Sequence, residues 1–211
     1  MVSNIVESTL YFMARPPRFD IDQFLDAAVR RAAVSGPAGV TMSAVAKDAG
    51  APSGSVYHRF PGRAALLAEV WLRTVERFQD GYLQALASQA DPRRSARAAT
   101  RHVVAWSRAY PQEAALLLYG PREFGRPEWS DEHRARADRG NQRVFAAVTA
   151  LARELGALDP QAAERVTIAL VDLPLSLVRR HLRAGEPLPA HAEDLAEQCA
   201  AALLDPPVEN P

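Results

Sequence analysis

The sequence contains a single cysteine, Cys199, so no disulfide can form within the chain. This scarcity favours a reducing compartment. No uninterrupted apolar run approaches the ~20 residues that a membrane-spanning helix needs. Residues 1–19 lack both a basic start and a long apolar stretch, so they do not resemble a secretory signal peptide. We expect a soluble cytoplasmic protein with no membrane partner.

Motifs of the common enzyme classes are also missing. The five histidines are scattered, and none belongs to an H-E-x-x-H zinc site. Neither a G-x-S-x-G nucleophile turn nor a G-x-x-x-x-G-K-[ST] phosphate loop is present. Cys199 lies on an apolar stripe, which is typical of a buried thiol rather than a nucleophile. An enzyme is therefore disfavoured, and we expect no cofactor and no metal.

Neither sign of charge is in excess, since 25 basic and 25 acidic residues give a formal net charge of zero. No overall field therefore draws the chain to DNA or to a membrane. The distribution is nevertheless uneven, because residues 15–63 hold seven bases against four acids. A modestly basic segment is usually only a solvated surface, so charge alone assigns no function.

Strand signals are almost absent, whereas helical periodicity recurs between glycines and prolines. Apolar residues make up 48% of the chain, enough for a substantial core. The sequence therefore predicts an all-α fold in which a head of three helices is joined by a long helix to a helical body. The expected helices span about 21–35, 42–49, from 53 to about 60, 63–87, 93–109, 111–119, 130–155, 160–184 with a kink at Pro174, and 191–204.

Two of these helices are too short to be stable alone in water. Thr41 can cap the first of them with its hydroxyl, and Gly50 supplies the positive-φ corner that ends it. Val56 and Phe60 can then face inward from the second. Two short helices packed across such a corner form a helix-turn-helix, in which the second helix enters the major groove of DNA.

The run from residue 41 to residue 67, TMSAVAKDAGAPSGSVYHRFPGRAALL, resembles the signature of TetR-type (TetR/AcrR) transcriptional regulators. Direct matches to the family pattern are Thr41, Ala46, Ala49, Gly50, Gly54, Tyr57, Phe60, Leu66 and Leu67. Conservative replacements are Val45 for Ile, Ser55 for Thr, Val56 for Leu or Ile, and Arg63 for Lys. Ala51-Pro52 departs from the usual Val-Ser, but Pro52 sets φ for the turn into the next helix. The resemblance covers about residues 20–70.

The resemblance implies a DNA-binding surface. Its residues would be Thr41, Lys47, Pro52, Ser53, Gly54, Ser55, Tyr57, His58, Arg59 and Arg63. Ser53 and Ser55 would reach base edges, and Gly54 would allow the backbone to approach DNA closely. The remaining polar side chains would mainly contact phosphates, which fix register rather than sequence preference. Arg15 and Arg18 of the preceding arm would lie near the flanking minor groove.

The resemblance also implies a homodimer formed by the last two long helices. The candidate interface residues are Ile168, Val171, Leu175 and Val178 in the first, and Leu195, Cys199 and Leu203 in the second. The same side chains also suit an intramolecular core, and this alternative stays open.

An effector pocket is expected within the body, because ligand sites combine apolar walls with a few polar groups. The candidates are His102, Trp106, Tyr110, Leu117, Tyr119, Phe124, Phe145 and Asp172, the last because a kink at Pro174 would free backbone carbonyls for a ligand. Ordinary core packing explains the aromatic members equally well.

We assign residues 1–19 to an arm or extension, 20–62 to the helix-turn-helix domain, 63–205 to an effector-binding and dimerisation domain, and 206–211 to a tail. Residues 1–12 are either an extension upstream of Met13 or part of an extra helical turn.

We expect a regulator, commonly a repressor in this family, that binds a palindromic operator in double-stranded DNA as a dimer. A small-molecule effector of unknown identity would release it. The alternative is a helix-turn-helix module controlled by a protein partner without an effector, which a body with a solid core would favour.

Overall fold

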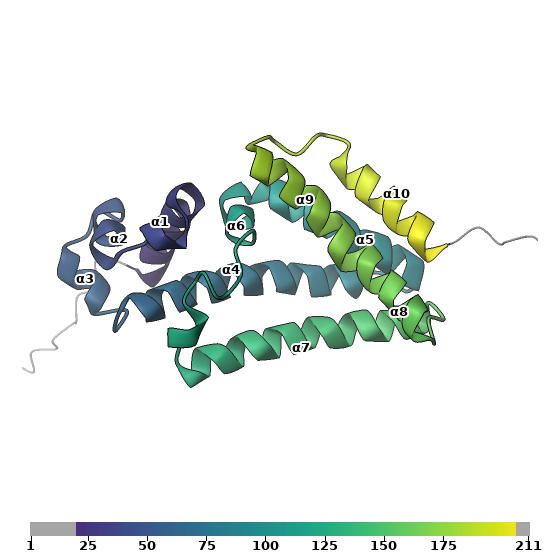
Figure 1. Ribbon diagram of the computed structural model, residues 1–211, viewed down its shortest axis with the longest axis horizontal. Coiled ribbons are helices and arrows are strands. Elements are labelled where there is room, and N and C mark those ends of the chain that lie inside the picture. The colour runs from purple at the N-terminus through teal and green to yellow at the C-terminus, as the bar shows by residue number, and fades with distance from the viewer. Residues whose placement is uncertain (1–19, 206–211) are drawn as a thin grey trace, which may run out of the picture.

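The computed structural model describes residues 20–205, and these residues form helices without a strand. The expected arm and tail, with Arg15 and Arg18, lie outside the described residues. The head consists of α1 (Ile21–Ser35), the short 3₁₀ turn η1 (Pro37–Gly39), α2 (Met42–Asp48) and α3 (Ser53–Tyr57). It lies at one end of α4 (Arg63–Leu86), which runs on into the body (Figure 1). The predicted all-α fold is confirmed.

The body surrounds the far part of α4. Its elements are α5 (Pro92–Ala109), α6 (Pro111–Leu116), the 3₁₀ turn η2 (Arg126–Glu128), α7 (Asp131–Glu154), α8 (Pro160–Thr167), the π-helical segment η3 (Ile168–Asp172), α9 (Leu173–Ala184) and α10 (Ala192–Leu204). α4 packs against α5 and α7, and α10 covers α5 (Figure 1).

Several helices begin at the side-chain caps that their sequences predict. The Thr41 hydroxyl accepts from the Ala44 amide at 3.2 Å, and Asp159 accepts from Ala162 at 2.8 Å. Gly50 has φ of 66°, as its place at the corner after α2 requires. α3 ends at Tyr57 and α6 at Leu116, so both are shorter than expected.

The head shares its hydrophobic core with the near end of the body. Phe24, Val45 and Val56 are fully enclosed, and Leu116 and Phe124 from the α6–α7 region complete the same cluster. A second cluster holds the far ends of α4, α5, α7, η3, α9 and α10 together. The first cluster therefore joins the head to the body by direct side-chain packing.

The helix predicted over residues 160–184, with a kink at Pro174, consists of three segments in the structure. These are α8, the π-helical η3 and α9. Proline has no N–H, so it cannot donate to the carbonyl of Leu170 one turn earlier. The buried hydroxyl of Tyr82 on α4 donates to that carbonyl instead, at 3.1 Å. Burial also raises the pKa of the Tyr82 phenol well above its ordinary value, so the donor stays protonated. Of the carbonyls that a kink at Pro174 was expected to free, that of Leu170 is therefore not available to a ligand.

Candidate nucleic-acid interface and body cavity

The packing of α3 leaves one of its faces open. Val56 is buried against α2, whereas Ser53, Gly54 and Tyr57 are exposed and Ser55 is half-buried. Tyr57 keeps 58% of its surface exposed, which is unusual for so large an aromatic side chain. The exposed face of α3 is therefore available to contact another molecule.

Gly54 has open space around it. A Cβ added at this position would meet no atom within 4 Å, so packing within the described residues does not require glycine here. Close approach of a DNA backbone would explain why the residue at position 54 is a glycine. Gly54 therefore remains a candidate for DNA contact.

The basic residues of the head differ in availability. Lys47, His58 and Arg59 are exposed and make no ion pair within residues 20–205. In contrast, Arg31 forms a two-pronged pair with Asp48, with N···O distances of 2.7 and 2.9 Å. Lys47, His58 and Arg59 are thus the free cationic or polar groups beside α3.

Two residues expected to contact phosphates, Thr41 and Arg63, make hydrogen bonds within the chain. Thr41 caps α2, as described above. The Arg63 guanidinium donates to the carbonyls of Val40 at 2.7 Å and Pro37 at 2.9 Å, tying α4 to the α1–α2 connection. The expectation that Arg63 is a phosphate ligand is corrected on this point, because the turn before α2 leaves carbonyls that need donors and Arg63 supplies them.

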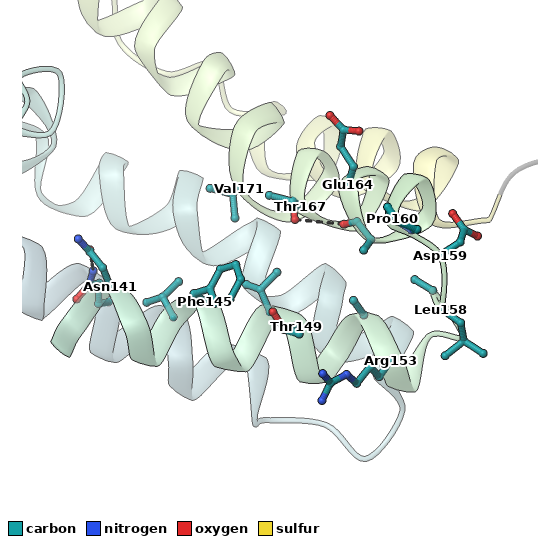
Figure 2. A pocket seen from close by; sticks show the side chains of 16 residues that line it. Asn141, Phe145, Thr149, Arg153, Leu158, Asp159, Pro160, Glu164, Thr167 and Val171 are labelled. Carbon is teal, nitrogen blue, oxygen red and sulfur yellow. Dashed lines mark hydrogen bonds between the residues drawn. The ribbon is translucent and has the colours of Figure 1, made fainter. Parts of the chain in front are cut away.

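The body contains an open cleft of about 790 Å³ between α7 and α8–η3. Figure 2 shows Phe145 and Thr149 of α7 facing Thr167 and Val171 across it. Phe145 and Leu158 at its rim are 75% and 85% exposed. Arg153, Asp159 and Glu164 are its charged residues, and the other walls are mostly apolar.

An inner cavity of about 340 Å³ continues this cleft toward the head. The two spaces have Gln79, Asn141, Val144 and Val171 in common, so they meet at these four residues. The inner part is lined largely by apolar and aromatic side chains from α4, α5, α7, η3 and α9 and by Leu117 just after α6. They include Trp71, Phe78, Tyr82 and Val103. Together they form one elongated space along α7.

Family comparison assigns the head. Residues 24–70 match the family model described as bacterial regulatory proteins, tetR family. Residues 24–70 therefore form a DNA-binding head of the TetR family. This identification confirms the resemblance drawn from residues 41–67.

Solved structures extend the similarity over the body, at the level of the fold. The fatty acid degradation regulator FadR from Bacillus halodurans superposes with a TM-score of 0.68 and 17% identity, covering 90% of this chain and 96% of that one. PfmR, a TetR-family regulator from Thermus thermophilus, gives 0.68 at 19% identity, covering 88% and 96%. FadR from Bacillus subtilis, solved in complex with stearoyl-CoA, gives 0.68 at 14% identity, covering 88% and 98%. No curated protein matches the sequence.

The eight side chains predicted to form an effector pocket do not lie in one cavity. Leu117 lines the inner cavity and Phe145 the cleft, while the rings of His102 and Trp106 lie behind the lining residue Phe78 at 5.8 and 5.2 Å. Tyr110 stacks on Arg77 outside. Tyr119 and Phe124 belong to the core shared with the head, because Phe124 packs on Trp71, and Asp172 lines a separate outer groove.

The predicted interface residues also divide into two groups. Ile168, Leu195 and Cys199 line an outer groove of about 490 Å³ between η3–α9 and α10. Val178 is buried, and Val171 and Leu175 turn toward the inner cavity, so these three pack within the chain. Leu203 is half-buried outside the groove lining. These positions fit the intramolecular alternative for Val171, Leu175 and Val178.

Sequence reasoning missed most of the lining of the cleft and inner cavity, including the polar residues Gln79 and Asn141. They are 62 positions apart, and their amides meet only because α4 and α7 pack side by side. For Gln79, a polar residue among the buried positions of α4 was the available signal, whereas Asn141 is exposed in a polar stretch of α7. Within residues 20–205, no group of His, Cys, Asp or Glu is arranged to hold a metal, and no helix has the length and apolar content needed to cross a membrane.

Proposed function

We propose that this regulator binds a palindromic operator as a homodimer and is released from it by a small molecule held in the body. The observation that carries this proposal is the elongated space beside α4, the same helix whose first residue, Arg63, is bonded to the head. A cavity of several hundred Å³ is the usual size for a ligand site. It disfavours control by a protein partner alone, which a solid body would favour.

The proposed DNA contacts are the exposed residues of α3 and its surroundings. Ser53, Ser55 and Gly54 would face base edges, and Tyr57, His58, Arg59, Lys47 and Thr41 would contact phosphates. Pro52 would set the entry angle of α3. We now give Arg63 the positioning role that its two carbonyl bonds support.

The proposed dimer uses the outer groove between η3–α9 and α10. Its exposed apolar residues Ile168 and Leu195 support this choice, since apolar side chains at a surface patch favour association. A two-fold dimer would place two α3 helices on successive half-sites of a palindrome.

Release by the effector would be a population shift. The ligand would favour body conformations in which the two heads have the wrong spacing for the operator. Ion pairs from Arg73 on α4 to Asp22 at 3.3 Å and Asp26 at 2.7 Å on α1 support α4 as the mechanical link. The core shared by head and body supports it as well.

We propose an elongated, largely apolar effector, because the cleft and inner cavity meet end to end. The Bacillus subtilis FadR structure with stearoyl-CoA, whose fold this chain shares, supports a long chain in such a space. Such a regulator would act in the cytoplasm, where its operator is found.

The test is selection of bound duplexes from a random DNA pool at one stated salt concentration, with wild type and Tyr57→Ala in parallel. We expect wild type to enrich a palindrome, and the variant to bind all duplexes more weakly with a smaller salt dependence, because a phosphate contact is lost. Failure of folded wild-type protein to enrich any sequence would overturn the proposal. Unchanged affinity of the variant would remove Tyr57 from the contacts.

A further inference from the structure

Gln79 and Asn141 form a polar pair where the cleft and the inner cavity meet. The Gln79 amide nitrogen on α4 donates to the Asn141 amide oxygen on α7 at 3.0 Å. Gln79 is only 9% exposed, and both side chains line both spaces. Figure 2 shows Asn141 at one end of the cleft. Any ligand that extends from the cleft into the inner cavity therefore passes this pair.

The Gln79 amide oxygen has no hydrogen-bond partner within residues 20–205. It is not among the fully enclosed unpaired atoms, which are Arg73 Nε and Thr74 Oγ1, so it is not sealed off. Gln79 lines the cleft and the inner cavity, so a ligand there could reach this oxygen. The oxygen lies over Gly140, where an added Cβ would come within 2.5 Å of it. Glycine at this point in α7 thus leaves room for the amide to stay where the two spaces meet.

The other buried polar group of the inner cavity is already satisfied, since the Tyr82 hydroxyl donates to Leu170. The amide pair therefore offers one spare acceptor on Gln79 and spare N–H donors on Asn141. The oxygen and nitrogen of an amide can be assigned either way round. If both amides were flipped, the spare donor would be on Gln79 and the spare acceptor on Asn141, so the pair would still offer one donor and one acceptor. The ligand-facing chemistry is one donor beside one acceptor.

We infer that this pair recognises a secondary amide placed between two apolar arms, as in an N-acylated alkylamine. The ligand N–H would donate to the free amide oxygen, and the ligand carbonyl would accept from the spare amide N–H. Apolar walls on both sides, such as Val144, Val148 and Leu170, would hold the two arms. A buried polar group left without its partner is costly, so an ester, which lacks the N–H donor, should bind more weakly. This inference rests on the proposed effector cavity.

The test is calorimetric titration of the full chain with two matched probes, N-butyldecanamide and butyl decanoate. For wild type we expect the amide to bind about tenfold more tightly than the ester, the usual order for one hydrogen bond. Gln79→Met should lower the affinity for N-butyldecanamide to that for butyl decanoate. The affinity for butyl decanoate itself should not change. Gln84→Met, an exposed change on the same helix, should keep the tenfold preference.

Asn141→Leu provides a second variant at an exposed position that tolerates an apolar residue, and it should also lose the preference. Equal binding of the two probes by wild type, or a preference that survives in Gln79→Met, would overturn the amide inference alone. Binding of neither probe would overturn both this inference and the proposed apolar effector. The DNA selection above contains no ligand, so DNA recognition is judged separately.

Discussion

Individual side chains on α3 determine what the head can touch. Val56 points into the core, and its neighbours Ser55 and Tyr57 are left at the surface. This division follows from helix geometry, because adjacent residues lie about 100° apart around the axis. The exposed ring of Tyr57 and the empty space around Gly54 are the residue-level features most suited to DNA.

Ser55→Ala removes a hydroxyl from the N-terminal end of α3 without disturbing the core. We expect a changed preference at one or two base pairs of the selected operator, with about 1 kcal/mol or more of discrimination lost there. Parallel selection from a random DNA pool measures this. An unaltered preference profile would mean that Ser55 does not read bases.

His102 provides a residue-level test of pH dependence. Burial lowers its pKa below the ordinary value of 6.5, although a hydrogen bond with the Phe78 carbonyl partly opposes this. Below about pH 6.5 the unfolded chain therefore takes up this proton before the folded one. The free energy of unfolding should fall as pH is lowered through 6.5 toward the depressed pKa.

Urea denaturation between pH 7.5 and 5 measures this slope. His102→Gln should reduce it, whereas His191→Gln, at an exposed position before α10, should leave it unchanged. Identical slopes for His102→Gln and wild type would assign the pH dependence to other groups.

Among the helices, the junction of η3 and α9 is the element that sequence alone describes least well. A proline within a helical pattern predicts a kink. The structure adds that Tyr82, 88 positions before Leu170, supplies the missing donor. α4 is thereby bonded to the element that separates the inner cavity from the outer groove.

Tyr82→Phe should lower the free energy of unfolding by about 1–3 kcal/mol, because the buried Leu170 carbonyl loses its donor. Pro174→Ala restores a backbone N–H one turn later. In the double variant, the further loss caused by Tyr82→Phe should be smaller than in wild type, and a double-mutant cycle by urea denaturation measures this coupling. Strictly additive effects would show that the two groups do not serve the same carbonyl.

At the scale of the whole molecule, ion pairs on α4 connect the body to the head. Arg136 on α7 bonds both Glu69, at 2.9 Å, and Glu76, at 2.5 Å, on α4. The bonds from Arg73 then connect α4 to α1. Ion pairs therefore connect α7 to α4, and α4 to α1 of the DNA-binding head.

Leu195→Arg tests the proposed dimer by placing a charge in the outer groove. We expect the variant to sediment as a monomer and to lose operator affinity, because two heads are needed for a palindrome. Leu158→Arg, at an exposed leucine outside that groove, is the matched control and should remain dimeric. A Leu195→Arg variant that is still dimeric would move the interface to another face.

The sequence by itself determined the helical class, most helix limits and the family of the head. These features depend on local signals: Thr41 as a cap, Gly50 as a corner, and inward-facing Val56 and Phe60 at short spacing. Tertiary structure alone decided which faces of distant helices meet. It assigned Phe124 to the shared core, Val178 to the body interior, Arg63 to backbone carbonyls, and Gln79 to a partner on α7. The physical reason is that helical periodicity identifies an apolar face but not the helix that covers it, and cavities form where those faces fit incompletely.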